Sequence, residues 1–66
     1  MRNVILYPGE DGSWVAECPS LPGCISQGKT KPDVMANIKE AIDLYIDVLR
    51  ERGEAIPGDH VEMVSV

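Results

Sequence analysis

The side chains of this sequence that could act as soft metal ligands or as thiols are two cysteines and one histidine. Cys18 and Cys24 lie six positions apart, and His60 is the single histidine. A structural zinc site needs four such ligands, so this set is one short. In a reducing compartment two free thiols that face the core are the simpler interpretation. His60 also lacks a recognisable nucleophile or orienting acid. The sequence therefore predicts no metal site, no cofactor and no catalytic residue.

The elements that must position these residues begin with three short strands. Residues 2–7, 13–18 and 24–27 are rich in the residue types that favour strands. Residues 8–12 separate the first two, and their Asp-Gly pair is a hairpin signal.

A proline-rich reversal is predicted between the second and third strands. Pro19 and Pro22 each remove a backbone donor, and Gly23 permits the positive φ of a tight turn. Leu21 lies between the two prolines. A second glycine, Gly28, precedes the next element and is a candidate for another positive φ.

Residues 31–52 are predicted to form one long helix. Thr30 is the expected N-cap, Pro32 suits the first turn, and Asp33 places negative charge at the N-terminus of the helix. Gly53 suits the position after the last turn. One apolar arc follows the helix. Its members are Val34, Met35, Ile38, Ala41, Ile42, Tyr45, Ile46, Val48 and Leu49.

Apolar side chains occur on both faces of the predicted strands. In the first strand Val4 and Leu6 face one way while Ile5 and Tyr7 face the other. A last predicted strand, residues 61–66, divides in the same manner. One helix covers one face, so the other face suggests a second protomer or partner. The alternative is that scattered exposed apolar residues are ordinary.

The chain length and charge restrict the partners. A single domain of residues 1–66 buries only about 60% of the surface of its unfolded chain, so we expect self-association to a dimer or tetramer. Six Lys and Arg against eleven Asp and Glu give a net charge of −5. This charge disfavours direct binding to nucleic acid and suits a basic protein, although it could simply maintain solubility. No signal peptide or membrane span is recognised, so we expect a cytoplasmic protein without a membrane partner.

Four sequence runs together resemble the N-terminal domain of HicB-like antitoxins. They are residues 11–17 (DGSWVAE), 19–24 (PSLPGC), 26–30 (SQGKT) and 36–42 (ANIKEAI). The resemblance covers nearly the whole chain. It implies an α+β domain of order β-β-β-α-β, with an antiparallel sheet and one long helix on one face, a partial ribonuclease-H-like arrangement. Its structural positions are Pro19, Leu21, Pro22, Gly23, Gly28, Thr30 and Asn37.

The resemblance also implies a function. HicB-like antitoxins neutralise a small basic HicA-type toxin, an mRNA-cleaving protein, by covering its active surface. Many of them continue into a DNA-binding domain, and no further helix follows here, so operator binding is not expected. Asn37 lies at the edge of the apolar arc, where its amide could tie the helix to the loop at residues 28–30.

Two other functions stay open at this point. A ribonuclease-H-like sheet could carry a residual metal-dependent nuclease, but residues 2–7 contain no acid to contribute to a metal site. The domain could also be a self-associating regulatory or ligand-binding module without a toxin.

The expected partner-facing surface is the acidic and aromatic hairpin. Glu10, Asp11 and Glu17 would attract a basic partner, and Trp14 would supply an apolar anchor. The alternative for Trp14 is a place in the core or in the self-association interface.

Overall fold

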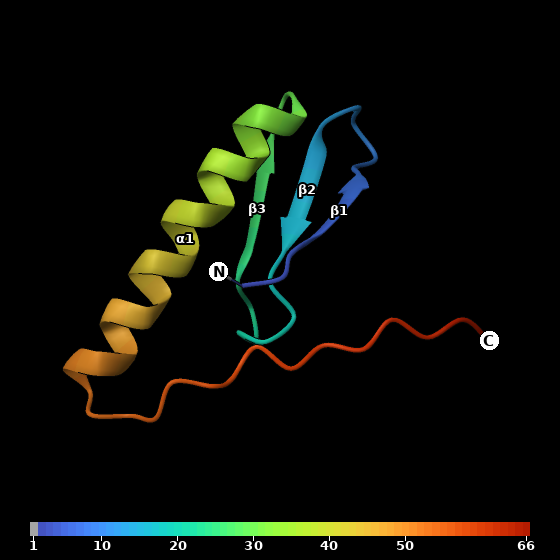
Figure 1. The fold of residues 1–66 in the computed structure, drawn as a ribbon. Coiled ribbons are helices and arrows are strands. Elements are labelled where there is room, and N and C mark those ends of the chain that lie inside the picture. The colour runs from blue at the N-terminus through green and yellow to red at the C-terminus, as the bar shows by residue number, and fades with distance from the viewer. Residues whose placement is uncertain (1) are drawn as a thin grey trace.

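The computed structural model describes residues 2–66 and contains three strands followed by one helix (Figure 1). The strands are β1 (Ile5–Pro8), β2 (Trp14–Glu17) and β3 (Ile25–Gly28), and the helix is α1 (Lys31–Glu51). The strands form one antiparallel sheet in the order β1-β2-β3. α1 lies across one face of this sheet, so the predicted α+β class is confirmed.

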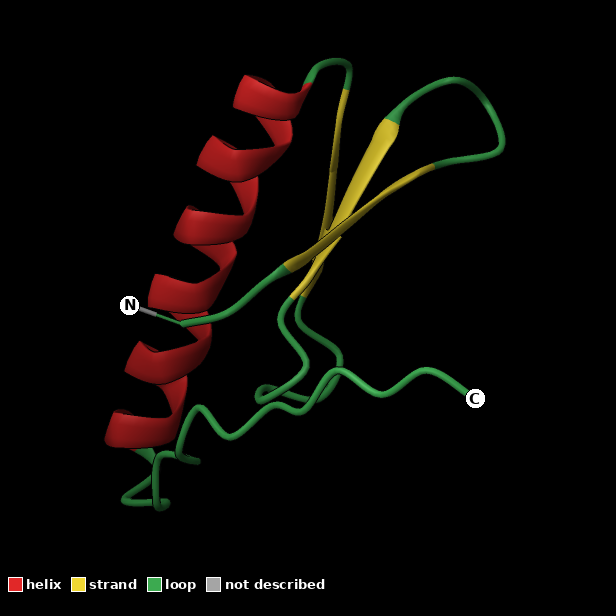
Figure 2. Ribbon diagram, turned by 45° about the vertical axis from the view of Figure 1, so that its right-hand side comes forward, coloured by secondary structure: helices red, strands yellow, loops and turns green. Residues whose placement is uncertain are grey.

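The C-terminal segment differs from the prediction. Residues 61–66, predicted as a fourth strand, join no ladder among residues 2–66 and run as an extended segment (Figure 2). Their alternation is compatible with a strand, but a strand exists only where a neighbour offers backbone partners. The chain passes the β2–β3 loop before it reaches this segment, and the segment then runs away from α1.

The predicted hairpin joins β1 to β2. Gly12 has a φ of 83°, and the carboxylate of Asp11 accepts hydrogen bonds from the backbone N–H and the hydroxyl of Ser13. The N–H of Gly9 donates to the carbonyl of Ser13 across 2.7 Å. Asp-Gly therefore makes the turn, as expected from its tolerance of positive φ.

The β2–β3 loop closes on itself through three backbone hydrogen bonds. The N–H of Cys18 donates to the carbonyl of Cys24 at 3.0 Å, the N–H of Leu21 to Cys18 at 3.1 Å, and the N–H of Cys24 to Leu21 at 3.0 Å. Gly23 has a φ of 82°, which confirms the predicted reversal. The loop directs Leu21 inward, and its side chain is fully buried.

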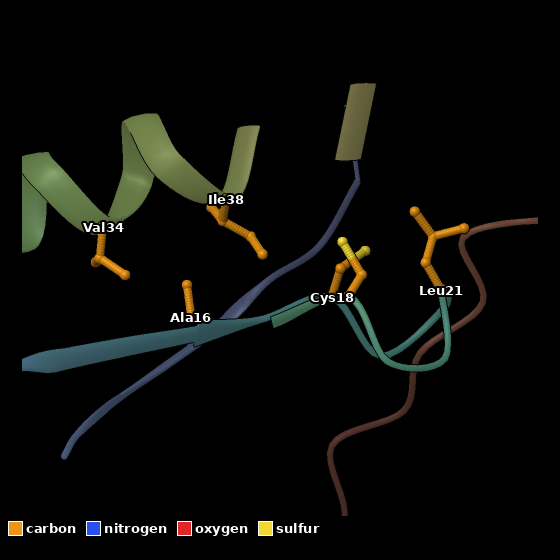
Figure 3. Packing of buried hydrophobic residues seen from close by; sticks show 6 residues of the cluster. Ala16, Cys18, Leu21, Val34 and Ile38 are labelled. Atoms are coloured by element: carbon orange, nitrogen blue, oxygen red, sulfur yellow. The ribbon is translucent and has the colours of Figure 1, made fainter. Parts of the chain in front are cut away.

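The core lies between α1, β2 and this loop. Val34 and Ile38 point from α1 toward Ala16 on β2, with Cys18 and Leu21 at the loop end (Figure 3). These side chains are almost completely buried, and they lie where the apolar arc of the helix meets the sheet. Cys18 and Cys24 are free and buried, so the prediction of thiols in the core is confirmed.

Both ends of α1 are capped as predicted. The Oγ1 of Thr30 accepts from the N–H of Asp33 at 3.2 Å, and Thr30 itself is extended. Gly53, just beyond the helix, has a φ of 68°. The Tyr45 hydroxyl donates to the carbonyl of Pro22 at 2.9 Å and ties the helix to the β2–β3 loop.

Two predicted structural residues connect β3 to α1. The side-chain amide of Asn37 donates to the carbonyl of Gln27 at 2.8 Å, one residue before the loop that we expected it to hold. The prediction for Gly28 needs a correction, because Gly28 is not among the glycines with positive φ. A Cβ at Gly28 would lie 2.5 Å from the backbone nitrogen of Val34. Gly28 is therefore needed for the close approach of strand and helix.

Candidate protein-binding site

The pairing register divides the sheet into two faces. Leu6 lies opposite Ala16, which lies opposite Ser26, and the burial of Ala16 identifies this row as the face toward α1. Successive side chains of a strand alternate between faces. The rows on either side of it therefore point away from the helix. We call this surface the outer face; it consists of Ile5, Tyr7, Val15, Glu17, Ile25 and Gln27.

No helix covers the outer face among the described residues (Figure 2). Ile5 is 37% exposed, Tyr7 40% and Ile25 51%. Val15 lies on the central strand, β2, between Tyr7 and Gln27, and is only 8% exposed. The outer face is thus an apolar surface with its polar groups at the margins.

A hollow of about 620 Å³ lies at the hairpin end of the outer face. Tyr7, Val15 and Gln27 contribute to its walls from the sheet, and the exposed acids Glu10 and Asp11 contribute from the turn. Hydrogen bonds from Ser13, first from its hydroxyl and then from its N–H, lower the pKa of Asp11 below its ordinary value. Asp11 therefore carries its negative charge at neutral pH.

The structure brings together only part of the predicted partner surface. Glu10 and Asp11 lie side by side in the turn, and Glu17 lies on the same outer face at its other end. Trp14 instead lies on the face toward α1, where the Lys31 Nζ is 4.7 Å from the centre of its ring. The aromatic side chain that accompanies the acids is Tyr7, which we had not selected. The signal available in the sequence was the alternation of Tyr7 with Leu6, which places the two side chains on opposite faces of the sheet.

The thiols and the histidine do not form a chemical site. Among the described residues, no three His, Cys, Asp or Glu side chains are grouped so that they could hold a metal ion. Burial, followed by the nearby Cys18, raises the pKa of the Cys24 thiol, so the thiol stays protonated at neutral pH. His60 is exposed, one residue before the C-terminal segment. What the arrangement offers is a recognition surface, with apolar side chains to bury and acids to attract a basic partner.

α1 is not a membrane span. No helix in the described part of the chain is long and apolar enough to cross a bilayer.

Comparison with known proteins gives the family. The model of the HicB-like antitoxins of bacterial toxin-antitoxin systems matches residues 3–65, and the chain belongs to this family. A UPF0150 protein of Thermoplasma acidophilum is 49% identical over 63 residues, which cover 96% of this chain and 91% of that protein. A UPF0150 protein of Archaeoglobus fulgidus is 42% identical over 62 residues, 91% of this chain and 90% of the relative. No solved structure matches the chain.

Proposed function

We propose that this domain inhibits a small basic HicA-type, mRNA-cleaving toxin by binding it and covering its active surface. Membership of the HicB-like family supports an antitoxin-type function. The observation that carries the finer proposal is the uncovered outer face, on which apolar side chains lie beside Glu10, Asp11 and Glu17.

The two kinds of residue on the outer face have different roles in this proposal. Ile5, Tyr7 and Ile25 supply apolar area that becomes buried in the complex, with Tyr7 as the aromatic anchor. The acids increase the rate of encounter with a basic surface, since complementary charge steers association. The Lys31 side chain lies over the ring of Trp14 on the sheet face toward α1, so Trp14 is not part of the outer face.

A matched pair of charge reversals tests the placement. Glu10→Lys with Asp11→Lys should slow association with the toxin and weaken its salt dependence, because the reversal lies at the contact. Glu40→Lys with Asp47→Lys makes the same change in net charge on exposed positions of α1 and should slow association less. Stopped-flow binding at several salt concentrations compares the two, with circular dichroism to verify folding. Equal slowing by both pairs would mean that net charge alone matters and that the outer face is not the site.

We also propose that the domain self-associates to a dimer or tetramer. The support is the amount of apolar surface that one copy leaves exposed, on the outer face and along α1. Analytical ultracentrifugation at micromolar concentration measures the assembly. A strict monomer of 7.2 kDa that unfolds cooperatively would contradict this proposal.

A further inference from the structure

An apolar groove of about 550 Å³ lies between α1 and the start of β1. Val4 forms one side, and Met35, Ile38 and Ile42 of α1 contribute the other. Its remaining lining residues are Arg2, Ala36, Lys39 and Asp43. The groove is therefore apolar along its length, with charged groups among its lining residues.

The edge of the sheet beside this groove has free backbone groups. Within residues 2–66, β1 pairs with β2 alone. The N–H of Gly9 points toward β2, where it donates to Ser13, so by alternation the odd residues of β1 face β2. Val4 and Leu6 consequently present their N–H and C=O groups to the open edge. Pro8, which has no N–H, lies at the end of this edge, where proline is tolerated.

The C-terminal segment has the alternating pattern of the fourth strand predicted from the sequence. In residues 61–66, Val61 and Met63 alternate with Glu62 and Val64. Met63 is 84% exposed and Val64 73%, so in one copy these apolar side chains have almost no cover. A free strand edge and an unpaired apolar segment are complementary in both hydrogen bonding and burial.

A cluster of hydrogen bonds fixes where this segment begins. The Asp59 carboxylate accepts from the N–H of Asn3 at 2.8 Å, from its side-chain amide at 2.9 Å, and from the Ser20 hydroxyl at 3.0 Å. Arg2 donates to the carbonyl of Pro57 at 2.7 Å. From this clamp the chain leaves below the β2–β3 loop, away from α1 and its groove (Figures 1 and 2). In one copy the segment therefore lies away from the groove between α1 and the start of β1, where it is available to the groove of a neighbouring copy.

We propose that two copies exchange their C-terminal segments, so that residues 61–66 of each add as a fourth strand to the free edge of β1 in the other. Val61 and Met63 then face the groove beside Met35 and Ile42, while Glu62 and Val64 face the opposite side of the sheet. The exchange is reciprocal, as expected for a twofold dimer. It rests on the self-association proposed above and is independent of toxin binding.

Two substitutions at neighbouring exposed positions test the exchange. Met63→Lys places a charge against the apolar groove and should weaken self-association by at least about tenfold. Val64→Lys adds the same charge on the opposite side and should weaken it less than about twofold. Both side chains are exposed in one copy, so neither change affects the folded core. Sedimentation equilibrium measures both. Equal losses, or none from Met63→Lys, would overturn the proposed exchange.

A second measurement distinguishes the possible occupants of the groove. Protein with ¹³C-labelled methionine methyls is mixed with unlabelled protein, and isotope-filtered NMR detects contacts between copies. We expect contacts between the Met63 methyl of one copy and Ile42 of another. A dimer in which Met63 contacts Ile42 only within its own chain would overturn the exchange and leave self-association intact. A monomer would overturn both, and in either case toxin binding is measured separately.

Discussion

At the scale of single residues, the junction between β3 and α1 is the most demanding position of the fold. Gly28 ends the strand so close to the helix that a Cβ there would lie 2.8 Å from the Cα of Val34. Val34 is itself fully buried, so its backbone has no room to retreat. Because glycine has only a hydrogen atom in place of a side chain, Gly28 allows α1 to lie close to the sheet.

Gly28→Ala should therefore destabilise the domain by about 1–3 kcal/mol, because the added methyl group forces strand and helix apart. Gly58→Ala is the matched control. Gly58 lies between α1 and the C-terminal segment, with nothing within 4 Å of the added Cβ, and the substitution should change the free energy of unfolding by less than about 0.5 kcal/mol. Urea denaturation followed by circular dichroism measures both. Similar values for the two variants would contradict the close-approach explanation.

Thr30→Ala should cost about 1 kcal/mol through loss of the N-cap hydrogen bond to Asp33. Thr30→Ser keeps the hydroxyl and should retain most of the stability, so the same denaturation experiment separates the cap from side-chain packing. If serine and alanine were equally destabilising, the hydroxyl would have no capping role.

At the scale of elements, the clamp at Asp59 connects the C-terminal segment to the start of β1. The N–H of Asn3, followed by the Ser20 hydroxyl and the charge of Arg2, lowers the pKa of Asp59 below its ordinary value of 3.8. A carboxylate with a lowered pKa in the folded state stabilises that state above its unfolded pKa. This contribution is lost as the pH falls through the lower, folded pKa.

We therefore expect the clamp to hold at neutral pH and to release below about pH 3.8. The carboxyl carbon of Asp59, followed by NMR titration, should have a midpoint below 3.8 in the natural protein. Ser20→Ala removes one donor and should move the midpoint upward toward that value. A wild-type midpoint at or above 3.8 would show that the clamp is absent in solution.

The elements also show what the sequence could predict. α1 was predicted at 31–52 and spans Lys31–Glu51, because its caps and apolar arc are local signals. β1 was predicted at 2–7 but spans Ile5–Pro8, since the ends of a strand depend on its partner. The same dependence explains why residues 61–66, predicted as a strand from their alternation, form no strand in one copy.

The candidate site was predictable to a similar extent. Glu10 and Asp11 are identified by the hairpin turn, whose position is set by local sequence. Alternation separates Trp14 from Glu17 and groups Tyr7 with Ile5, but it does not say which group the helix covers. That choice is made by the packing of Val34 and Ile38 against Ala16, which is a tertiary event.

At the scale of the whole molecule, the helix is longer than the sheet that it covers. Its 21 residues extend about 30 Å, whereas a strand of four residues extends about 13 Å, and the last turns of α1 project beyond the strands (Figure 1). Leu44 and Val48 in this part are 60% and 43% exposed. A groove of about 510 Å³ separates them from the start of β3. Apolar surface on so many sides favours a protein that acts in an assembly.

The central claim, that this domain inhibits a basic toxin by covering it, is tested most directly by titration. RNA cleavage by a HicA-type toxin would be measured in the presence of increasing amounts of the domain. We predict that cleavage falls in proportion to added protein and stops at a fixed ratio of the two, and that the Glu10→Lys, Asp11→Lys variant requires more protein. Undiminished cleavage in the presence of excess folded domain would contradict the account. RNA cleavage by this chain alone would also contradict it, if substitution of one carboxylate abolished that cleavage.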